Sequence, residues 1–203
     1  MTPTARSEKK MKEEIRMGAD LGPCVVLITG VMAAGKSTVA QLLAESLPRA
    51  VHVRGDVFRR MIVSGRAEMT PDEAEEARSQ LDLRQRLSAR VADAYADDGW
   101  TAVVQDIVLG DDLPRYLDRV RTRPLHVVVL APSPEAVRTR EAGRGKTGYG
   151  EWTVEAFDAY LRSGTPRIGL WLDTSGQTPE ETVSAILDGL RGGAGEPGLP
   201  REE

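Results

Sequence analysis

Residues 30–37 carry the strongest chemical signal in the sequence, because they read GVMAAGKS and match the spacing G-x-x-x-x-G-K-S/T. Glycines let the backbone approach phosphate oxygens closely, and successive amide N–H groups then converge on the anion at the positive end of a helix. Lys36 adds a positive charge beside a transferred phosphate, and the Ser37 hydroxyl is a suitable Mg²⁺ ligand. The residues expected to bind a nucleotide here are Gly30, Ala33, Ala34, Gly35, Lys36, Ser37 and Thr38.

An acid and two arginines follow Val51–Arg54, a short segment that reads as a strand. Asp56 and Arg59 stand one helical turn apart, so they share one side of a helix that starts there. At the carboxyl end of a parallel strand, Asp56 can accept or orient the proton of a substrate hydroxyl beside the γ-phosphate. Arg59 and Arg60 are then candidates for substrate binding. The alternative is an Asp that only caps the helix beside a solvated Arg, and the two roles are compatible.

Two polar residues close the next apolar run, Thr101–Gln105. Asp106 is expected beside the phosphate loop, where its carboxylate can hold a water molecule that is bound to Mg²⁺. An Asp that only forms a turn is the competing interpretation. Gln105 is a candidate for binding the molecule that accepts the phosphate.

The segment 138–150 combines cations with glycines, and four of the glycines lie between residues 143 and 150. This composition predicts a mobile lid whose cations fold over a triphosphate and exclude water. Arg140 and Arg144 are the first candidates for neutralising charge on a transferring phosphoryl group, and Arg138 is a further candidate for nucleotide binding. The alternative is a basic surface loop.

Short apolar runs alternate with helical patterns, which predicts an α/β fold with a parallel sheet and helices on both faces. Helices are expected over Lys36–Leu47 and Asp72–Asp97. The apolar face expected for the longer helix consists of Leu83, Leu87, Val91 and Tyr95. The five expected strands are Val25–Thr29, Val51–Arg54, Thr101–Gln105, Leu125–Leu130 and Ile168–Asp173.

The chain has 203 residues with a formal net charge of −4, and 40% of them are hydrophobic. This predicts one domain over residues 21–191, between a polar extension at 1–20 and a disordered tail at 192–203. No apolar run approaches the ~20 residues of a membrane helix, and one cysteine cannot build a disulfide framework. Without a visible secretory signal the expected compartment is the cytoplasm. The negative charge makes nucleic acid the less favoured partner.

The loop at 30–37, a Walker A motif, resembles that of the P-loop nucleoside-triphosphate hydrolase and kinase superfamily. The chain has no Asn, so it lacks the N-K-x-D motif with which GTPases read guanine. No apolar run ends in the Asp-Glu pair of AAA-type ATPases. The spacing of Asp56 and Arg59 is similar to that of small P-loop kinases. Among these are chloramphenicol phosphotransferase-like proteins, adenylylsulfate kinases and 5′-hydroxyl polynucleotide kinases.

This resemblance implies a three-layer P-loop fold of the kinase type with a small lid. It implies that Asp56 is the general base, that Arg59 binds substrate or phosphate, and that the loop at Ser175 lies near the adenine. The implied cofactors are ATP and Mg²⁺.

The sequence therefore predicts an ATP-dependent kinase that transfers the γ-phosphoryl group to a hydroxyl of a small molecule. That molecule is an antibiotic, a sugar, a nucleoside or another metabolite. A 5′-hydroxyl polynucleotide kinase and an ATP-binding regulator without an acceptor are the alternatives. The acceptor's identity, the choice between ATP and GTP, and the formation of a homodimer stay open.

Overall fold

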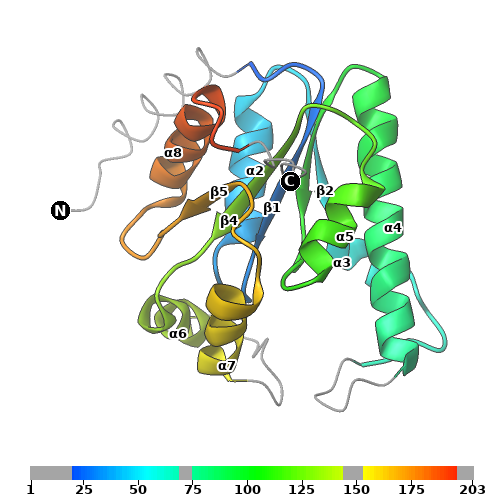
Figure 1. Cartoon of the computed structure of the whole chain (residues 1–203), viewed down its shortest axis with the longest axis vertical. Helices are drawn as coiled ribbons and strands as arrows, with labels where there is room; N and C mark the ends of the chain where they lie inside the picture. Colours follow the sequence, from blue (N-terminus) through cyan, green and yellow to red (C-terminus); the bar gives the residue numbers. More distant parts are fainter. Residues whose placement is uncertain (1–19, 69–74, 144–152, 196–203) are drawn as a thin grey trace, which may run out of the picture.

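The computed structural model describes residues 20–68, 75–143 and 153–195. Five strands form an all-parallel sheet in the order β2-β3-β1-β4-β5 (Figure 1). They are β1 (Cys24–Gly30), β2 (Ala50–Arg54), β3 (Thr101–Gln105), β4 (Leu125–Leu130) and β5 (Leu170–Leu172). The predicted α/β fold class, with five parallel strands, is confirmed.

Helices cover both faces of this sheet and give the fold its three layers. In Figure 1, α2 and α8 lie together on one side of the strands, and α4 and α5 lie together on the other. The helices are α2 (Lys36–Ser46), α3 (Gly55–Arg60), α4 (Glu75–Asp97), α5 (Asp112–Arg119), α6 (Pro134–Ala142), α7 (Val154–Ala159) and α8 (Pro179–Arg191), and a π-helical turn, η1 (Tyr160–Gly164), follows α7.

The two central strands, β1 and β4, form the middle of the core. All seven residues of β1 and all six of β4 are buried, since helices cover both faces of a parallel sheet. Nine of these thirteen residues are Val, Leu or Ile, whose side chains fill the interlayer space without needing polar partners. The carboxyl ends of these strands are therefore rigid supports for the loops that follow them.

The buried face of α4 differs from the one predicted. Leu83 is 39% exposed and Tyr95 is 43% exposed, whereas Ala89, Ala92 and Ala96 are buried. The predicted contact face was wrong for Leu83 and Tyr95, because helical spacing identifies a stripe but not what it faces. The small side chains let α4 lie close to the sheet, and the half-buried Val91 packs against the core beside them, whereas Leu83 and Tyr95 remain on the outer side.

The last strand and the chain end also depart from the prediction. β5 spans only Leu170–Leu172, and the residue before it, Gly169, has φ of +75°. The backbone beyond α8 belongs to the folded body as far as Gly195, whose carbonyl accepts a hydrogen bond from Val127 N at 2.8 Å. Residues 192–195 are thus not part of a disordered tail, while 1–19 and 196–203 lie outside the described residues.

Candidate active site

The phosphate loop joins β1 to α2 at the carboxyl edge of the sheet. Gly30 has φ of +141°, and a Cβ there would lie 2.4 Å from the carbonyl oxygen of Leu130 in β4. Only glycine fits this close approach. Ala33 has φ of +59°, the only left-handed residue other than glycine in the part of the chain that the structure describes. The loop accepts this unfavourable conformation, which is typical of backbone shaped for a ligand.

The ammonium of Lys36 lies within this loop. Its Nζ donates hydrogen bonds to the carbonyl oxygens of Gly30 at 2.9 Å and Val31 at 2.7 Å, and the residue is 7% exposed. These carbonyls satisfy a buried charge that would otherwise be costly. The Lys36 ammonium is therefore placed where it could donate to the oxygens of a bound phosphate in place of these carbonyl oxygens.

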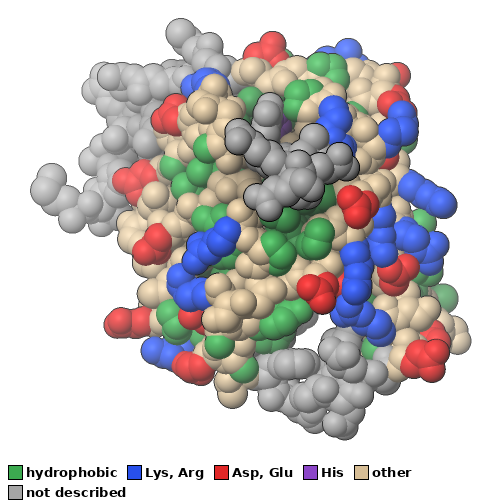
Figure 2. Space-filling model, viewed as in Figure 1, with side chains coloured by type: hydrophobic (Ala, Val, Ile, Leu, Met, Phe, Trp, Pro, Cys, Tyr) green, Lys and Arg blue, Asp and Glu red, His purple; other side chains and the backbone are tan. Residues whose placement is uncertain are grey.

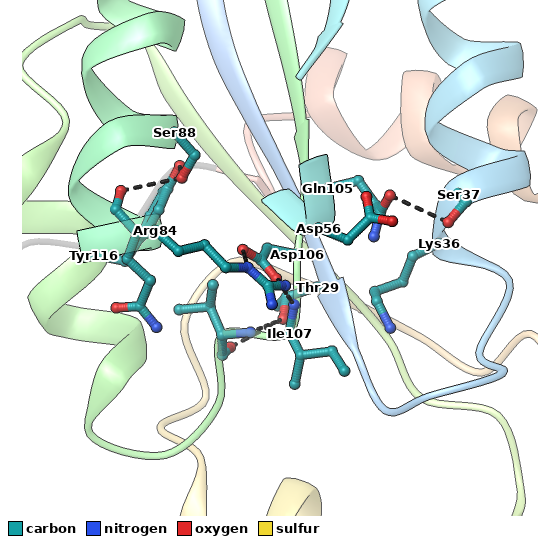
Figure 3. A network of polar contacts seen from close by, with 12 residues as sticks. Thr29, Lys36, Ser37, Asp56, Arg84, Ser88, Gln105, Asp106, Ile107 and Tyr116 are labelled. Atoms are coloured by element: carbon teal, nitrogen blue, oxygen red, sulfur yellow. Dashed lines mark hydrogen bonds and ion pairs between the residues drawn. The ribbon is translucent and has the colours of Figure 1, made fainter. Parts of the chain in front are cut away.

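The Ser37 hydroxyl connects the loop to the neighbouring strand. Ser37 Oγ donates to Gln105 Oε1 at 3.1 Å, and Gln105 is the buried last residue of β3 (Figure 3). Spacing within the sequence gave no sign of this pair, since 68 residues separate its members. Gln105 thus contacts the predicted Mg²⁺ ligand, and its predicted contact with an acceptor stays a prediction.

Asp56 stands in the first turn of α3, directly after β2. Its Oδ2 pairs with Arg60 at 3.0 Å, while its Oδ1 is buried and has no hydrogen-bond partner among the described residues. Figure 3 shows Asp56 between Asp106 on one side and Lys36 on the other. A buried carboxylate oxygen without a donor is well suited to receive the proton of a bound hydroxyl.

Asp106 is fully buried and tightly held by protein donors. Arg84 Nε donates to Oδ2 at 2.8 Å, Arg84 Nη2 donates to Oδ1, and Ile107 N donates to Oδ1 at 2.7 Å (Figure 3). The predicted role of Asp106 in holding a water bound to Mg²⁺ stays a prediction. Sequence reasoning missed Arg84, which lies on a long helix and has no motif around it.

The lid candidates separate in the structure. Arg140 of α6 donates to the carbonyl oxygens of Ala34, at 3.3 Å, and Thr174, so it lies against the phosphate loop. Arg138 instead pairs with Glu155 of α7. Arg144 lies outside the described residues.

Two further candidates are held by contacts of their own. The Ser175 hydroxyl accepts a hydrogen bond from Ser133 N at 2.8 Å and donates to Asp173, so it ties the loops after β4 and β5 together. Its predicted nearness to adenine stays a prediction. Arg59 pairs with Glu68, and this contact lowers the pKa of the exposed Glu68 carboxyl.

The residues present fit a Mg²⁺ ion that is bound together with nucleotide phosphates. Within 20–68, 75–143 and 153–195 there is no cluster of three or more His, Cys, Asp or Glu side chains that could hold a metal ion alone. Mg²⁺ commonly uses one or two protein ligands, substrate phosphates and water. The Ser37 hydroxyl at the start of α2 would be such a ligand. Among the same residues, no helix is long and apolar enough to cross a membrane.

The sheet order, the phosphate loop and the acid after β2 define a P-loop nucleotide-binding domain. The chain belongs to the family described as AAA domain, whose pattern matches residues 25–166. Its β3 ends in Gln105 and Asp106, not in the Asp-Glu pair expected of AAA-type ATPases. A UPF0200 protein of Aeropyrum pernix is 32% identical over 133 residues, which are 64% of this chain and 70% of that protein.

Solved structures of kinases share the fold. A sugar kinase from Janibacter sp. HTCC2649 superposes with a TM-score of 0.61 and 22% identity, covering 82% of this chain and 94% of that one. A gluconokinase from Sinorhizobium meliloti 1021 superposes with a TM-score of 0.59 and 20% identity, covering 85% and 94%. The resemblance to P-loop small-molecule kinases is thus confirmed at the level of the fold.

Proposed function

We propose that this protein is a kinase that uses ATP and Mg²⁺ to phosphorylate a hydroxyl group of a small molecule. The observation that carries the proposal is the buried Oδ1 of Asp56, which has no hydrogen-bond partner among residues 20–68, 75–143 and 153–195 and lies at the same sheet edge as the phosphate loop. A regulator that only binds nucleotide has no need of a carboxylate oxygen kept free of donors. The kinase names of the structural neighbours support the same class.

In the proposed reaction the acceptor oxygen attacks the γ-phosphorus while the bond to the leaving oxygen of ADP breaks. Asp56 Oδ1 receives the hydroxyl proton, and Arg60 on Oδ2 orients the carboxylate. Lys36 and Arg140 neutralise charge on the transferring group. Mg²⁺, held by Ser37 and phosphate oxygens, supplies further charge neutralisation when bound.

The distribution of Lys and Arg on the surface does not favour a nucleic acid as the acceptor. Figure 2 shows Lys and Arg over the α4–α5 side of the molecule with acidic groups among them. The ion pairs there include Arg78 with Asp112, Arg119 with Asp82, and Arg121 with Asp97. Paired arginines have less charge available for phosphates, so we favour a small acceptor over an oligonucleotide.

The test is a screen for ADP release with Mg-ATP and hydroxylated antibiotics, sugars, nucleosides and 5′-hydroxyl oligonucleotides. We expect one small molecule to stimulate release, and Asp56→Ala to slow transfer to it by about 100- to 10,000-fold. Lys36→Ala should slow transfer by about 100-fold or more. Asp118→Ala, an exposed acid on α5, is the matched control and should keep the wild-type rate.

The outcomes separate the alternatives. Preferential stimulation by oligonucleotides, with strong salt dependence, would favour a polynucleotide kinase. Nucleotide binding without stimulation by any hydroxyl compound would favour a regulator. A near-wild-type rate for Asp56→Ala would remove Asp56 as the base. The cytoplasmic location and the homodimer stay predictions of the sequence.

A further inference from the structure

Arg84 reaches from α4 to the carboxyl end of β3 and holds Asp106 with two of its three guanidinium nitrogens. Nε donates to Oδ2 at 2.8 Å and Nη2 donates to Oδ1. The Arg84 side chain is 16% exposed and that of Asp106 is 0% exposed. Such a planar, two-point contact fixes the direction of the guanidinium far better than a single bond does.

The third nitrogen of Arg84, Nη1, has no partner in the part of the chain that the structure describes. Among the described residues, Nη1 donates to no acceptor, and it is not one of the polar atoms enclosed by protein. An arginine kept largely out of water but left with a free N–H group has hydrogen-bonding capacity that a ligand can complete. Because Asp106 holds the group in place, a ligand would bind with little loss of side-chain freedom.

Two positive groups meet beside Asp56. Burial lowers the pKa of Arg84 to about 10, the charge of Asp56 opposes this, and the charge of Arg59 lowers the pKa further. Arg84 and Arg59, which is itself paired with Glu68, therefore influence each other electrostatically. They come from α3 and α4, which pack together (Figure 1).

Arg84 lies on the opposite side of Asp56 from the phosphate loop. In Figure 3, Arg84 and Asp106 lie on one side of Asp56, whereas Lys36 and Ser37 lie on the other. A nucleotide held by the loop would occupy the Lys36 side. The Arg84 side is then the one left for the body of an acceptor whose hydroxyl points at Asp56.

We propose that Arg84 binds an oxyanion of the acceptor, so that the substrate is a hydroxyl compound that also bears a carboxylate or phosphate. An oxyanion beside Arg84 would use the Nη1 that has no acceptor among the described residues, and it would add negative charge near Arg59, which Glu68 already pairs. A neutral acceptor would supply no charge to this hydrogen-bonding group. This assignment rests on the proposed kinase function and narrows its substrate class.

The experiment compares matched acceptors on the full chain with saturating Mg-ATP. One series is glycerol, glycerate and glycerol phosphate, and the other is sorbitol, gluconate and sorbitol phosphate. We expect kcat/KM for an anionic member to exceed that of its neutral partner by about 10-fold or more. The carboxylate and phosphate members show which oxyanion is preferred. A neutral member that reacts as well as its anionic partners overturns the assignment but leaves the kinase proposal intact.

Variants then test Arg84 itself. Arg84→Lys keeps a charge beside Asp106 but cannot reproduce the three-nitrogen geometry. We expect it to raise the acceptor KM by about 10-fold or more and to leave the KM of ATP within about twofold. Arg90→Met, which removes an exposed arginine from the same helix, should change neither constant. An unchanged acceptor KM in Arg84→Lys contradicts the assignment, and thermal melting checks that both variants fold.

A binding measurement covers the case in which no compound of the panel is phosphorylated. Inorganic sulfate is titrated into the protein saturated with ADP and Mg²⁺, so that the phosphate loop is already filled. Sulfate binding that Arg84→Lys weakens by about 10-fold or more supports the assignment. Absence of sulfate binding, or binding that the variant does not alter, overturns it. The kinase proposal fails separately if the chain does not bind Mg-ATP.

Discussion

Gly55 lies directly against the carboxylate of Asp106. A Cβ on Gly55 would stand 2.0 Å from Asp106 Oδ2, far inside any real contact distance. Gly55 immediately precedes Asp56, so the backbone that carries the proposed base rests on the Arg84–Asp106 ion pair. The proposed acceptor side of the site is built on this contact, which joins β2, β3 and α4.

Gly55→Ala tests the contact. Neither partner can move easily, because Asp106 is buried and held by three donors, so we expect overpacking to cost about 1–3 kcal/mol. The displacement of Asp56 should also reduce kcat. Denaturant unfolding and steady-state kinetics measure the two effects. Gly192→Ala is the control, since its nearest neighbours lie 3.5 Å away, and equal stability of the two variants would contradict the expectation.

Arg140 and Arg138 should differ in their contribution to transfer. Arg140 contacts the phosphate loop through Ala34, whereas Arg138 is paired with Glu155 on the surface. We expect Arg140→Ala to lower kcat/KM by about 10-fold or more, and Arg138→Ala to have a clearly smaller effect. Kinetics at saturating acceptor with varied ATP decide the matter. The reverse order of effects would show that the lid adopts another arrangement during the reaction.

His52 should make the fold sensitive to mild acid. Burial lowers the pKa of His52 below its usual 6.5, Arg54 lowers it further, and Asp56 partly opposes them. Between the lowered and the usual pKa, the unfolded chain binds more protons than the folded chain. This contribution to stability therefore falls as the pH drops below about 6.5.

We expect the melting temperature of wild type to fall more than that of His52→Gln between neutral and mildly acidic buffer. Thermal unfolding followed by circular dichroism measures both proteins at each pH. The comparison cancels the titration of carboxylates that the two proteins share. Equal losses in the two proteins would mean that His52 titrates normally in the fold.

The packing of α4 predicts different losses of stability for substitutions at two of its residues. Ala92 is completely buried, so Ala92→Leu should cost about 1–3 kcal/mol by overpacking. Leu83 is 39% exposed, so Leu83→Ala should cost less than about 1 kcal/mol. Urea unfolding at constant pH compares them. A larger loss for Leu83→Ala would restore the contact face expected from the helical spacing.

Local patterns made the phosphate loop and the strands predictable. The loop works through its own backbone, and its signal lies within eight consecutive residues, Gly30 to Ser37. Four of the five strands were predicted to within one residue at each end. Three of them, β1, β3 and β4, are fully buried and therefore largely apolar, whereas β2 is only partly buried. β5 was predicted at the right place in the sequence, but the predicted strand was too long. It is a short edge strand that follows the turn at Gly169.

Contacts between distant segments escaped prediction. The bonds from Ser37 to Gln105 and from Arg84 to Asp106 join residues 68 and 22 positions apart. No local pattern distinguishes Arg84 from Arg90 on the same helix, or Arg140 from Arg138 on α6. The contacts of these arginines depend on which side of each helix packs against the rest of the fold.

The sequence by itself determined the class of chemistry, because a phosphate loop is a property of consecutive backbone amides and the residue that follows them. Only the tertiary structure decided which acids and arginines meet around that loop. Side-chain partners depend on how helices rotate against the sheet, and that rotation is set by close packing of small residues such as Ala89 and Ala92. The acceptor side of the site is therefore a product of packing.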